Sequence, residues 1–241
     1  MPPVTICVLT YGDFFGLASR CIGSILDHCD RRSYDLIIGA NQVGELTREY
    51  LDRLVLRGEI DRLYASQTNI NKCPMMRNMF ASVETEFLWW FDDDSYIVDG
   101  NALDLRLQVG RSATKQTVVW GHQFFFGHEA DFSSGMDAVA FVLSATWYRG
   151  KSPPSWLPGG KGEFNFEERG VGDGRWFFIT GGCWFARTAA MHALNWPDPR
   201  IVKRCDDVFL SEAVRQQGWA IQDIGPAGVV INAHPRRGNE L

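Results

Sequence analysis

The segment 87–94, with the sequence FLWWFDDD, consists of five apolar residues followed by three aspartates. A short apolar run bounded by polar residues is typical of a strand that is buried on both faces of a parallel sheet. Because ligand sites in open α/β sheets lie at the carboxyl ends of the strands, we expect the three carboxylates at such an edge.

These three aspartates indicate a metal site. Adjacent carboxylates raise one another's pKa unless a cation neutralises them. Mg²⁺ is typically held by one or two carboxylates together with substrate phosphates, so Asp92, Asp93 and Asp94 predict a divalent metal. The alternative is a strand-ending turn, in which a single Asp is a common residue.

Over the first 90 residues, apolar runs alternate with stripes of apolar residues at helical spacing. Strands that alternate with helices form βαβ units, so the pattern predicts an α/β fold with a mainly parallel sheet flanked by helices. The expected strands are Val4–Leu9, Tyr34–Ala40, Ile60–Ala65 and Phe87–Phe91, and the expected helices are Leu17–Leu26, Leu46–Leu56 and Met75–Val83.

The second half has a different pattern, in which strands are not regularly separated by helices, and we expect a smaller antiparallel portion there. Residues 149–174 are rich in Gly, Pro and Ser. A loop of that length in a compact domain is usually functional, so we expect residues 150–174 to form a lid that excludes water from the site. The expected strands are Val118–Phe126, Ala138–Leu143, Trp176–Ala186 and Val229–Asn232, and the expected helix is Asp206–Gln217.

The composition limits the class of protein. With 45% hydrophobic and 22% charged residues in 241, the chain is globular, and we expect a single domain. A net charge of −5 argues against a nucleic-acid partner, because phosphate affinity depends mainly on Lys and Arg. We expect no transmembrane segment, since no stretch approaches the roughly 20 apolar residues that span a bilayer. The six scattered cysteines predict reduced, mostly buried thiols and a cytoplasmic location.

Three segments in the right order resemble a known family. Residues 90–97, WFDDDSYI, resemble the DxD element of GT-A-fold glycosyltransferases, particularly fringe-like and β-1,3-galactosyltransferase-like enzymes. Residues 180–185, TGGCWF, and residues 205–210, CDDVFL, are similar to the segments that precede and open the catalytic helix of those enzymes. Asn69 and the Arg77–Asn78 pair resemble the large synthase-type inverting family. The resemblance implies one GT-A-type domain over residues 1–241, with a nucleotide-sugar-binding half (1–100) and an acceptor-binding, catalytic half (101–241).

The resemblance also implies a set of metal and nucleotide contacts. Asp94 would ligate Mn²⁺ or Mg²⁺ on the donor diphosphate, Asp92 would contact the ribose or the metal, and Asp93 could share either role. His234 would be a further metal ligand, with a solvated or core histidine as the alternative. The remaining nucleotide-sugar contacts that the resemblance implies are Thr10, Tyr11, Asp13, Arg77, Gly181 and Gly182, together with Asn41 as an amide substitute for the Asp that many relatives use for the base.

Asp207 is the candidate general base, because an inverting transfer needs a carboxylate that removes the proton of the acceptor hydroxyl. Asp206 is the second candidate, and either residue could instead be a simple helix N-cap. Trp184, next to the small residues Gly181 and Gly182, and Trp156 are the candidate acceptor contacts, since indole faces suit sugar C–H surfaces. A place in the core is the alternative for each tryptophan.

Taken together, the sequence predicts a metal-dependent inverting glycosyltransferase. The donor would be a nucleotide-diphosphate sugar, with a UDP-sugar expected first, and the acceptor would be a hydroxyl of a glycan, a protein or a small molecule. Two alternatives stay open: a DxD-type phosphohydrolase, and a carbohydrate-binding domain without turnover.

Overall fold

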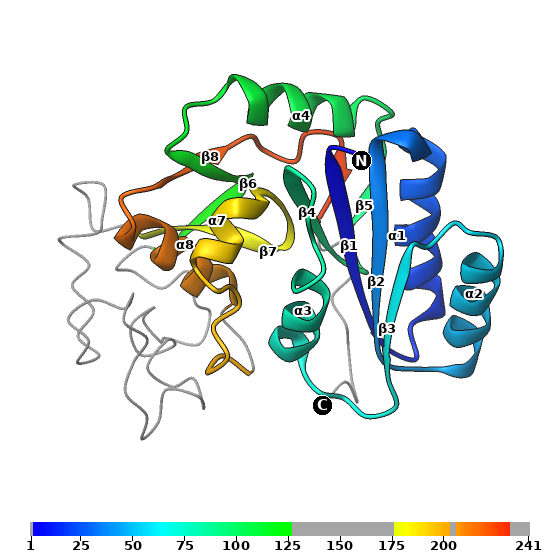
Figure 1. Cartoon of the computed structure of the whole chain (residues 1–241). Coiled ribbons are helices and arrows are strands. Elements are labelled where there is room, and N and C mark those ends of the chain that lie inside the picture. The colour runs from blue at the N-terminus through cyan, green and yellow to red at the C-terminus, as the bar shows by residue number, and fades with distance from the viewer. Residues whose placement is uncertain (1, 127–175, 203–205, 232–241) are drawn as a thin grey trace.

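The computed structural model describes residues 2–126, 176–202 and 206–231. Within these ranges, seven strands form one sheet in the order β3-β2-β1-β4-β7-β6-β8 (Figure 1). All neighbouring strands are parallel except β7, which is antiparallel to both β4 and β6. The strands are β1 (Val4–Gly12), β2 (Tyr34–Val43), β3 (Arg62–Ser66), β4 (Phe87–Asp92), β6 (Thr117–Phe126), β7 (Trp176–Arg187) and β8 (Ala220–Asp223).

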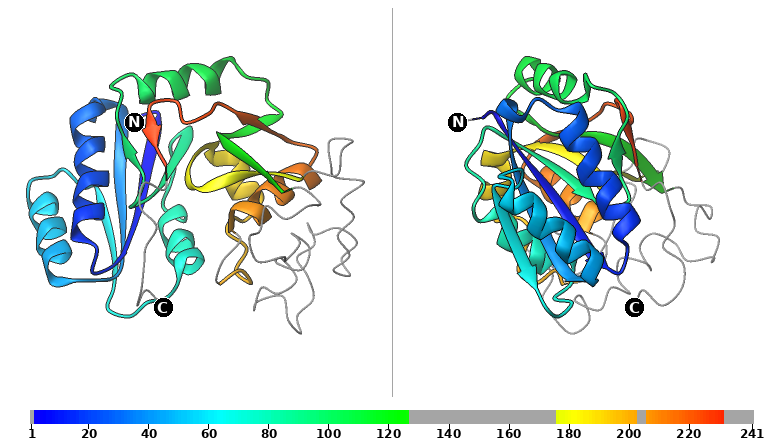
Figure 2. Two further views of the ribbon diagram at one scale, coloured as in Figure 1. Left: turned by 180° about the vertical axis from the view of Figure 1, so that it is seen from behind. Right: turned by 90° about the vertical axis from the view of Figure 1, so that its right-hand side faces the viewer.

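Helices cover both faces of this sheet, and β5 (Tyr96–Ile97) and β9 (Val229–Val230) form a small antiparallel ribbon beside it. Figure 1 and Figure 2 both place α1 and α2 on the opposite side of the sheet from α3. The mainly parallel α/β sheet with a smaller antiparallel part is thereby confirmed. The helices are α1 (Phe15–His28), α2 (Glu45–Leu56), α3 (Lys72–Phe80), α4 (Ala102–Ser112), α7 (Thr188–Ala193) and α8 (Asp206–Gln216), with a short 3₁₀ turn, η1 (Arg31–Ser33).

The central strand β4 divides the core into two layers. Phe87, Trp89 and Phe91 pack with α1, α2 and α4, whereas Leu88 and Trp90 pack with α3, α7 and α8. Side chains alternate between the faces of a strand. Asp92 therefore continues the row of Leu88 and Trp90 and lies on the α3 side of the sheet.

The start of α3 differs from the sequence expectation. The helix begins at Lys72 rather than at Met75, since Pro74 is tolerated in a first helical turn. Asn71, with φ 72°, ends the preceding loop in the left-handed region. This earlier start brings Lys72 to the edge of the sheet where β3 ends.

Two α-helices and two strands were not expected from the sequence: α4, α7, β5 and β8. Two residues interrupt the apolar stripe of α4. Arg106 is buried and donates to the carbonyls of Ala102 and Ala227, and Gly110 lies where a Cβ would meet the Phe87 ring at 2.8 Å. Because contacts with distant residues accommodate Arg106 and Gly110, the apolar stripe of α4 cannot be recognised from the local spacing of the sequence.

Several expectations fall on residues outside the described ranges. These are the strand Ala138–Leu143, the lid at 150–174, Trp156, Cys205 and His234. The other five cysteines are buried, as expected. In the described ranges, no helix combines the length and apolar character that crossing a bilayer requires.

Candidate active site

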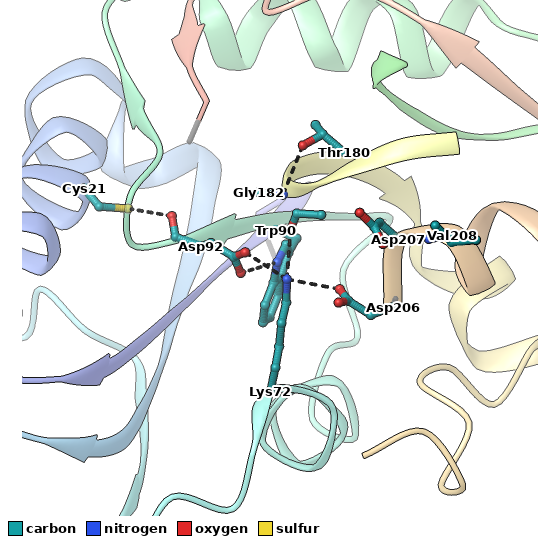
Figure 3. A network of polar contacts seen from close by, with 10 residues as sticks. Cys21, Lys72, Trp90, Asp92, Thr180, Gly182, Asp206, Asp207 and Val208 are labelled. Atoms are coloured by element: carbon teal, nitrogen blue, oxygen red, sulfur yellow. Dashed lines mark hydrogen bonds and ion pairs between the residues drawn. The ribbon is translucent and has the colours of Figure 1, made fainter. Parts of the chain in front are cut away.

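One edge of the sheet collects polar side chains from several elements. The parallel strands β1, β2, β3 and β4 all end there, and α3 begins there. Because β7 pairs with β4 in antiparallel register, with Phe91 opposite Cys183, residues 180–182 lie just beyond the end of β4. The first turn of α8 completes the group, so Asp92, Asp206 and Asp207 meet around Lys72 (Figure 3).

Lys72 is the centre of this cluster. Its Nζ lies 2.8 Å from Asp92 Oδ2, 3.1 Å from Asp206 Oδ2 and 3.2 Å from the carbonyl oxygen of Gly181. The ammonium also lies 5.7 Å from the centre of the Trp90 ring. Sequence reasoning missed this residue. The sequence held no local signal for it, because the expected helix began at Met75 and the observed one begins at Lys72.

The charges around Lys72 keep it protonated. Burial alone would lower the pKa of its ammonium, but Asp206 and Asp92 raise that pKa well above its ordinary value. One ammonium therefore faces two carboxylates directly, and Asp207 follows Asp206 in the chain. The cluster holds more negative than positive charge.

Asp207 has the properties of a base that works near neutral pH. Burial and the neighbouring Asp206 raise the pKa of its carboxyl to about 7, against the opposing effect of Lys72. Its Oδ1 accepts a hydrogen bond from the Val208 N–H at 2.8 Å. A carboxyl with a pKa close to the working pH is well suited to accept a proton and release it again.

The backbone at Asp207 is held by a buried serine of α8. Ser211 Oγ donates to the carbonyl of Asp207 at 2.8 Å and accepts from the N–H of Ile179 in β7 at 2.9 Å. This bridge fixes the first turn of α8 against the sheet. Asp206 is the member of the pair that is bound directly to Lys72.

Gly181 keeps the space between these groups open. A Cβ at this position would lie 3.4 Å from Asp207 Oδ2 and 3.4 Å from Lys72 Nζ. The Gly182 N–H reaches Thr180 Oγ1 at 3.4 Å (Figure 3). Gly181 is half-buried whereas Gly182 is buried, so only Gly181 leaves backbone accessible beside the carboxylate.

The three aspartates at the end of β4 differ in their environments. Asp92 is bound by Lys72 and by Trp90 Nε1, which donates to its Oδ1 at 3.2 Å. Asp93 is buried, and its Oδ2 accepts from the Tyr11 N–H at 3.4 Å, which ties the end of β1 to this turn. Asp94 is half-buried.

The chemistry of this turn fits a hard divalent cation. Burial is the main cause that raises the pKa of the Cys21 thiol, followed by Cys183 and then by Asp94 and Asp92, so both carboxylates act on the same buried thiol. Among the described residues, no group of three or more His, Cys, Asp or Glu side chains could hold a metal. Mg²⁺-type ions usually complete their shell with phosphate and water oxygens, so one or two carboxylates are sufficient.

The residues expected at the nucleotide base divide into two groups. Tyr11 and Asp13 lie partly or fully exposed at the end of β1. Thr10 and Asn41 are buried, at 1% and 2% exposure, and their side chains bind protein groups. Thr10 Oγ1 donates to the carbonyl of Gly39 at 3.2 Å, so the expectation of a nucleotide contact is not supported for Thr10.

Asn41 is bonded to the loop that leads into α3. Its Nδ2 donates to Asn69 Oδ1 at 3.0 Å, and its Oδ1 accepts from the Ile70 N–H at 2.9 Å. Asn69 Oδ1 accepts in addition from the Asn71 N–H at 2.8 Å. The structure does not support the expected contact between Asn41 and the nucleotide base, because both Nδ2 and Oδ1 of Asn41 bind the loop.

Two further expectations need correction. Arg77 points away from the cluster and donates to the carbonyls of Asn195 and Pro197, at 3.1 and 2.7 Å. Trp184 is 1% exposed and stacks on Trp90, with ring centres 6.2 Å apart. It faces the core layer of α3 and α8, because strand alternation puts it on the same face as its register partner Trp90. Its indole is not available to an acceptor.

Solved structures with the same arrangement of strands and helices are known. A mannosyltransferase from Pyrobaculum calidifontis, in complex with GDP-Man and Mn²⁺, matches with a TM-score of 0.65 and 14% identity, over 98% of this chain and 58% of that chain. S. aureus TarS matches with a TM-score of 0.55 and 14% identity, over 93% of this chain and 35% of that chain. A TarS fragment in complex with UDP matches with a TM-score of 0.55 and 13% identity, over 94% of this chain and 61% of that chain. No protein-family model and no curated protein matches the sequence.

The chain has a GT-A-like glycosyltransferase fold. It spans less than two thirds of the length of each of these proteins. In this GT-A-like fold, the cluster of Lys72, Asp92 and Asp206 lies at the carboxyl edge of the sheet, where open α/β sheets bind their ligands.

Proposed function

We propose that the protein is a metal-dependent inverting glycosyltransferase that uses a nucleoside-diphosphate sugar. The observation that supports this most is Asp207, whose carboxyl has a pKa of about 7 and faces the space beside Gly181 at the ligand edge of the sheet. The fold is shared with a mannosyltransferase that binds GDP-Man and Mn²⁺. We expect a UDP-sugar or a GDP-sugar as donor and a hydroxyl group as acceptor, with a cytoplasmic location for the reaction.

In the proposed reaction, Asp207 accepts the proton of the acceptor hydroxyl while that oxygen attacks the anomeric carbon. The bond between this carbon and the phosphate oxygen breaks on the opposite side, so the configuration at the carbon is inverted. The nucleoside diphosphate leaves with the bonding electrons. Asp94, with Asp92 beside it, would hold a Mn²⁺ or Mg²⁺ ion that neutralises charge on the departing diphosphate.

The neighbouring residues assist without touching the reacting atoms. Ser211 and the Val208 N–H orient Asp207, as described above. Gly181 leaves room for the sugar next to this carboxylate. General-base catalysis of this kind typically contributes 10²- to 10⁴-fold in rate.

The experiment is a panel of UDP- and GDP-sugars incubated with the protein in Mn²⁺, in Mg²⁺ or in EDTA, with release of nucleoside diphosphate as the readout. Metal-dependent release that increases when an acceptor is added supports the proposal. Release of phosphate from a monoester without sugar transfer would favour a phosphohydrolase. Sugar binding without any turnover would favour a carbohydrate-binding domain, and both results contradict the proposal.

A further inference from the structure

Three separate elements meet at the ammonium of Lys72. Asp92 belongs to the end of β4, Gly181 to β7 and Asp206 to the first turn of α8. An ammonium group has three N–H donors. Its three protein acceptors, at 2.8, 3.1 and 3.2 Å, match that number, so Lys72 binds the protein rather than presenting a vacant donor to a ligand.

Fold stability is a weak explanation for this arrangement. A cation at the first position of α3 opposes the helix dipole. Only 23% of the Lys72 side chain is exposed, and removing an ion pair from water costs free energy that the pairing repays only in part. Residues that break such local rules are most often found at functional sites.

The position of Asp207 depends on these contacts. Asp206 precedes it directly, so holding Asp206 Oδ2 at 3.1 Å from Lys72 fixes the chain that carries the Asp207 carboxyl. A second contact lies on the other side, where Ser211 links the Asp207 carbonyl to β7. Lys72 is thus the link between the start of α8 and the end of β4.

We propose that Lys72 is a positioning residue for the transfer reaction, which holds the first turn of α8 in place through Asp206 and thereby aims Asp207 at the acceptor. The proposal rests on the proposed function. A misplacement of about 1 Å at a catalytic group can reduce a rate by about 10²-fold. Loss of Lys72 would therefore affect the chemical step more than the binding of the donor.

The first test compares the kinetics of Lys72→Met with those of Lys115→Met, a matched control at an exposed lysine. We expect Lys72→Met to lower kcat by about 10- to 100-fold while the donor KM stays within about threefold. Lys115→Met should resemble the wild type. A tenfold higher donor KM with an unchanged kcat would show that Lys72 is a donor ligand and would overturn the proposal.

The second test adds Asp206→Asn to Lys72→Met. Removing the cation alone leaves Asp92, Asp206 and Asp207 close together without it, whereas the double variant removes one charge of each sign. We expect Lys72→Met and Asp206→Asn to lower kcat by similar factors and the double variant to be no slower than either, because each substitution removes the same contact. A double variant in which the two losses multiply would show that Lys72 does not act through Asp206. Where Lys72→Met does not fold, the double variant is compared with Asp206→Asn, and a kcat at least about tenfold lower in the double variant contradicts the proposal.

A third measurement separates this proposal from the proposed function. Hydrogen exchange of the backbone amides of residues 206–216 needs no donor or acceptor. We expect exchange at least about fivefold faster in Lys72→Met, with no change in Lys115→Met. Unchanged exchange would overturn the positioning role, and faster exchange would support it even where no sugar donor is turned over.

Discussion

Two polar regions lie at the same edge of the sheet and differ in how their groups are satisfied. At the end of β2, Asn41 and Asn69 form neutral hydrogen bonds within the loop that leads to α3. At the end of β4, Lys72, Asp92 and Asp206 bring full charges together. The first region is held by hydrogen bonds of ordinary length between uncharged amide groups. The second region contains more carboxylates than ammonium groups.

We propose that this difference separates polar residues that stabilise the fold from polar residues that act on a substrate. A buried amide with partners at both ends contributes to stability and leaves little for a substrate to bind. Buried charges cost free energy and shift one another's pKa, as at Asp207, and such shifts are concentrated at functional sites. We therefore expect substitutions in the charged region to lower the rate of transfer. Substitutions at the end of β2 should instead lower the stability of the fold.

Asp207→Asn should give the largest effect on rate. The amide cannot accept the proton of the acceptor, so transfer should fall by at least about 10²-fold, while the donor dissociation constant stays within about threefold. Asp104→Asn, in the first turn of α4, is the matched control for any effect on a helix start. Transfer by Asp207→Asn at a rate close to the wild type would show that the carboxylate only caps the helix.

Asp94→Asn should weaken metal-dependent donor binding. Loss of an anionic oxygen ligand should raise the dissociation constant of UDP or GDP in Mn²⁺ by at least about tenfold, as measured by calorimetry, and should have little effect in EDTA. Asp27→Asn, at an exposed position of α1, is the control. Equal nucleotide affinity in Mn²⁺ for Asp94→Asn and the control would remove Asp94 from the metal site.

The pH dependence of kcat tests the charged region as a whole. Asp207 faces Asp206, Lys72 and Asp92, and its pKa of about 7 means that the base is protonated below neutral pH. We expect kcat to fall about tenfold per pH unit below pH 7 and to level off above it. The same raised pKa means that the folded state retains a proton that the unfolded state releases. The free energy of unfolding should therefore fall as the pH rises from about 4 to about 7. An acidic limb of the profile near pH 4 would contradict the assignment.

Asn41→Ala should have the smallest effect on rate. It leaves the Ile70 N–H without its acceptor and removes one of the two donors to Asn69 Oδ1, so we expect about 1–3 kcal/mol less stability in urea unfolding. Values of kcat and donor KM should stay within about threefold, and Asn78→Ala, at an exposed position of α3, is the stability control. A tenfold rise in donor KM with unchanged stability would show that Asn41 binds the base and would reverse the comparison.

The sequence was sufficient for six of the seven strands of the large sheet and for part of the site. Apolar runs such as Phe87–Phe91 gave the strands, since a buried strand needs them whatever its neighbours are. The aspartates after β4, Gly181 and Asp207 were expected to form one site, and the structure brings Asp92, Gly181 and Asp207 around Lys72.

The remaining features depend on contacts between distant residues. A single lysine at the start of α3 has no pattern that predicts its carboxylate partners 20 and 134 positions further along the chain. The burial of Asn41 depends on the path of the 69–71 loop, and that of Trp184 on its register with Trp90. All of these features arise from contacts in the folded chain and cannot be predicted from the local spacing of residues.

The most direct test of the central claim is the position of Mn²⁺ in crystals grown with a nucleoside diphosphate. We expect an anomalous difference peak within direct coordination distance of the Asp94 carboxylate, with the diphosphate on the side that faces Gly181 and Asp207. A manganese ion bound elsewhere, or a diphosphate bound away from the end of β4, would contradict the account.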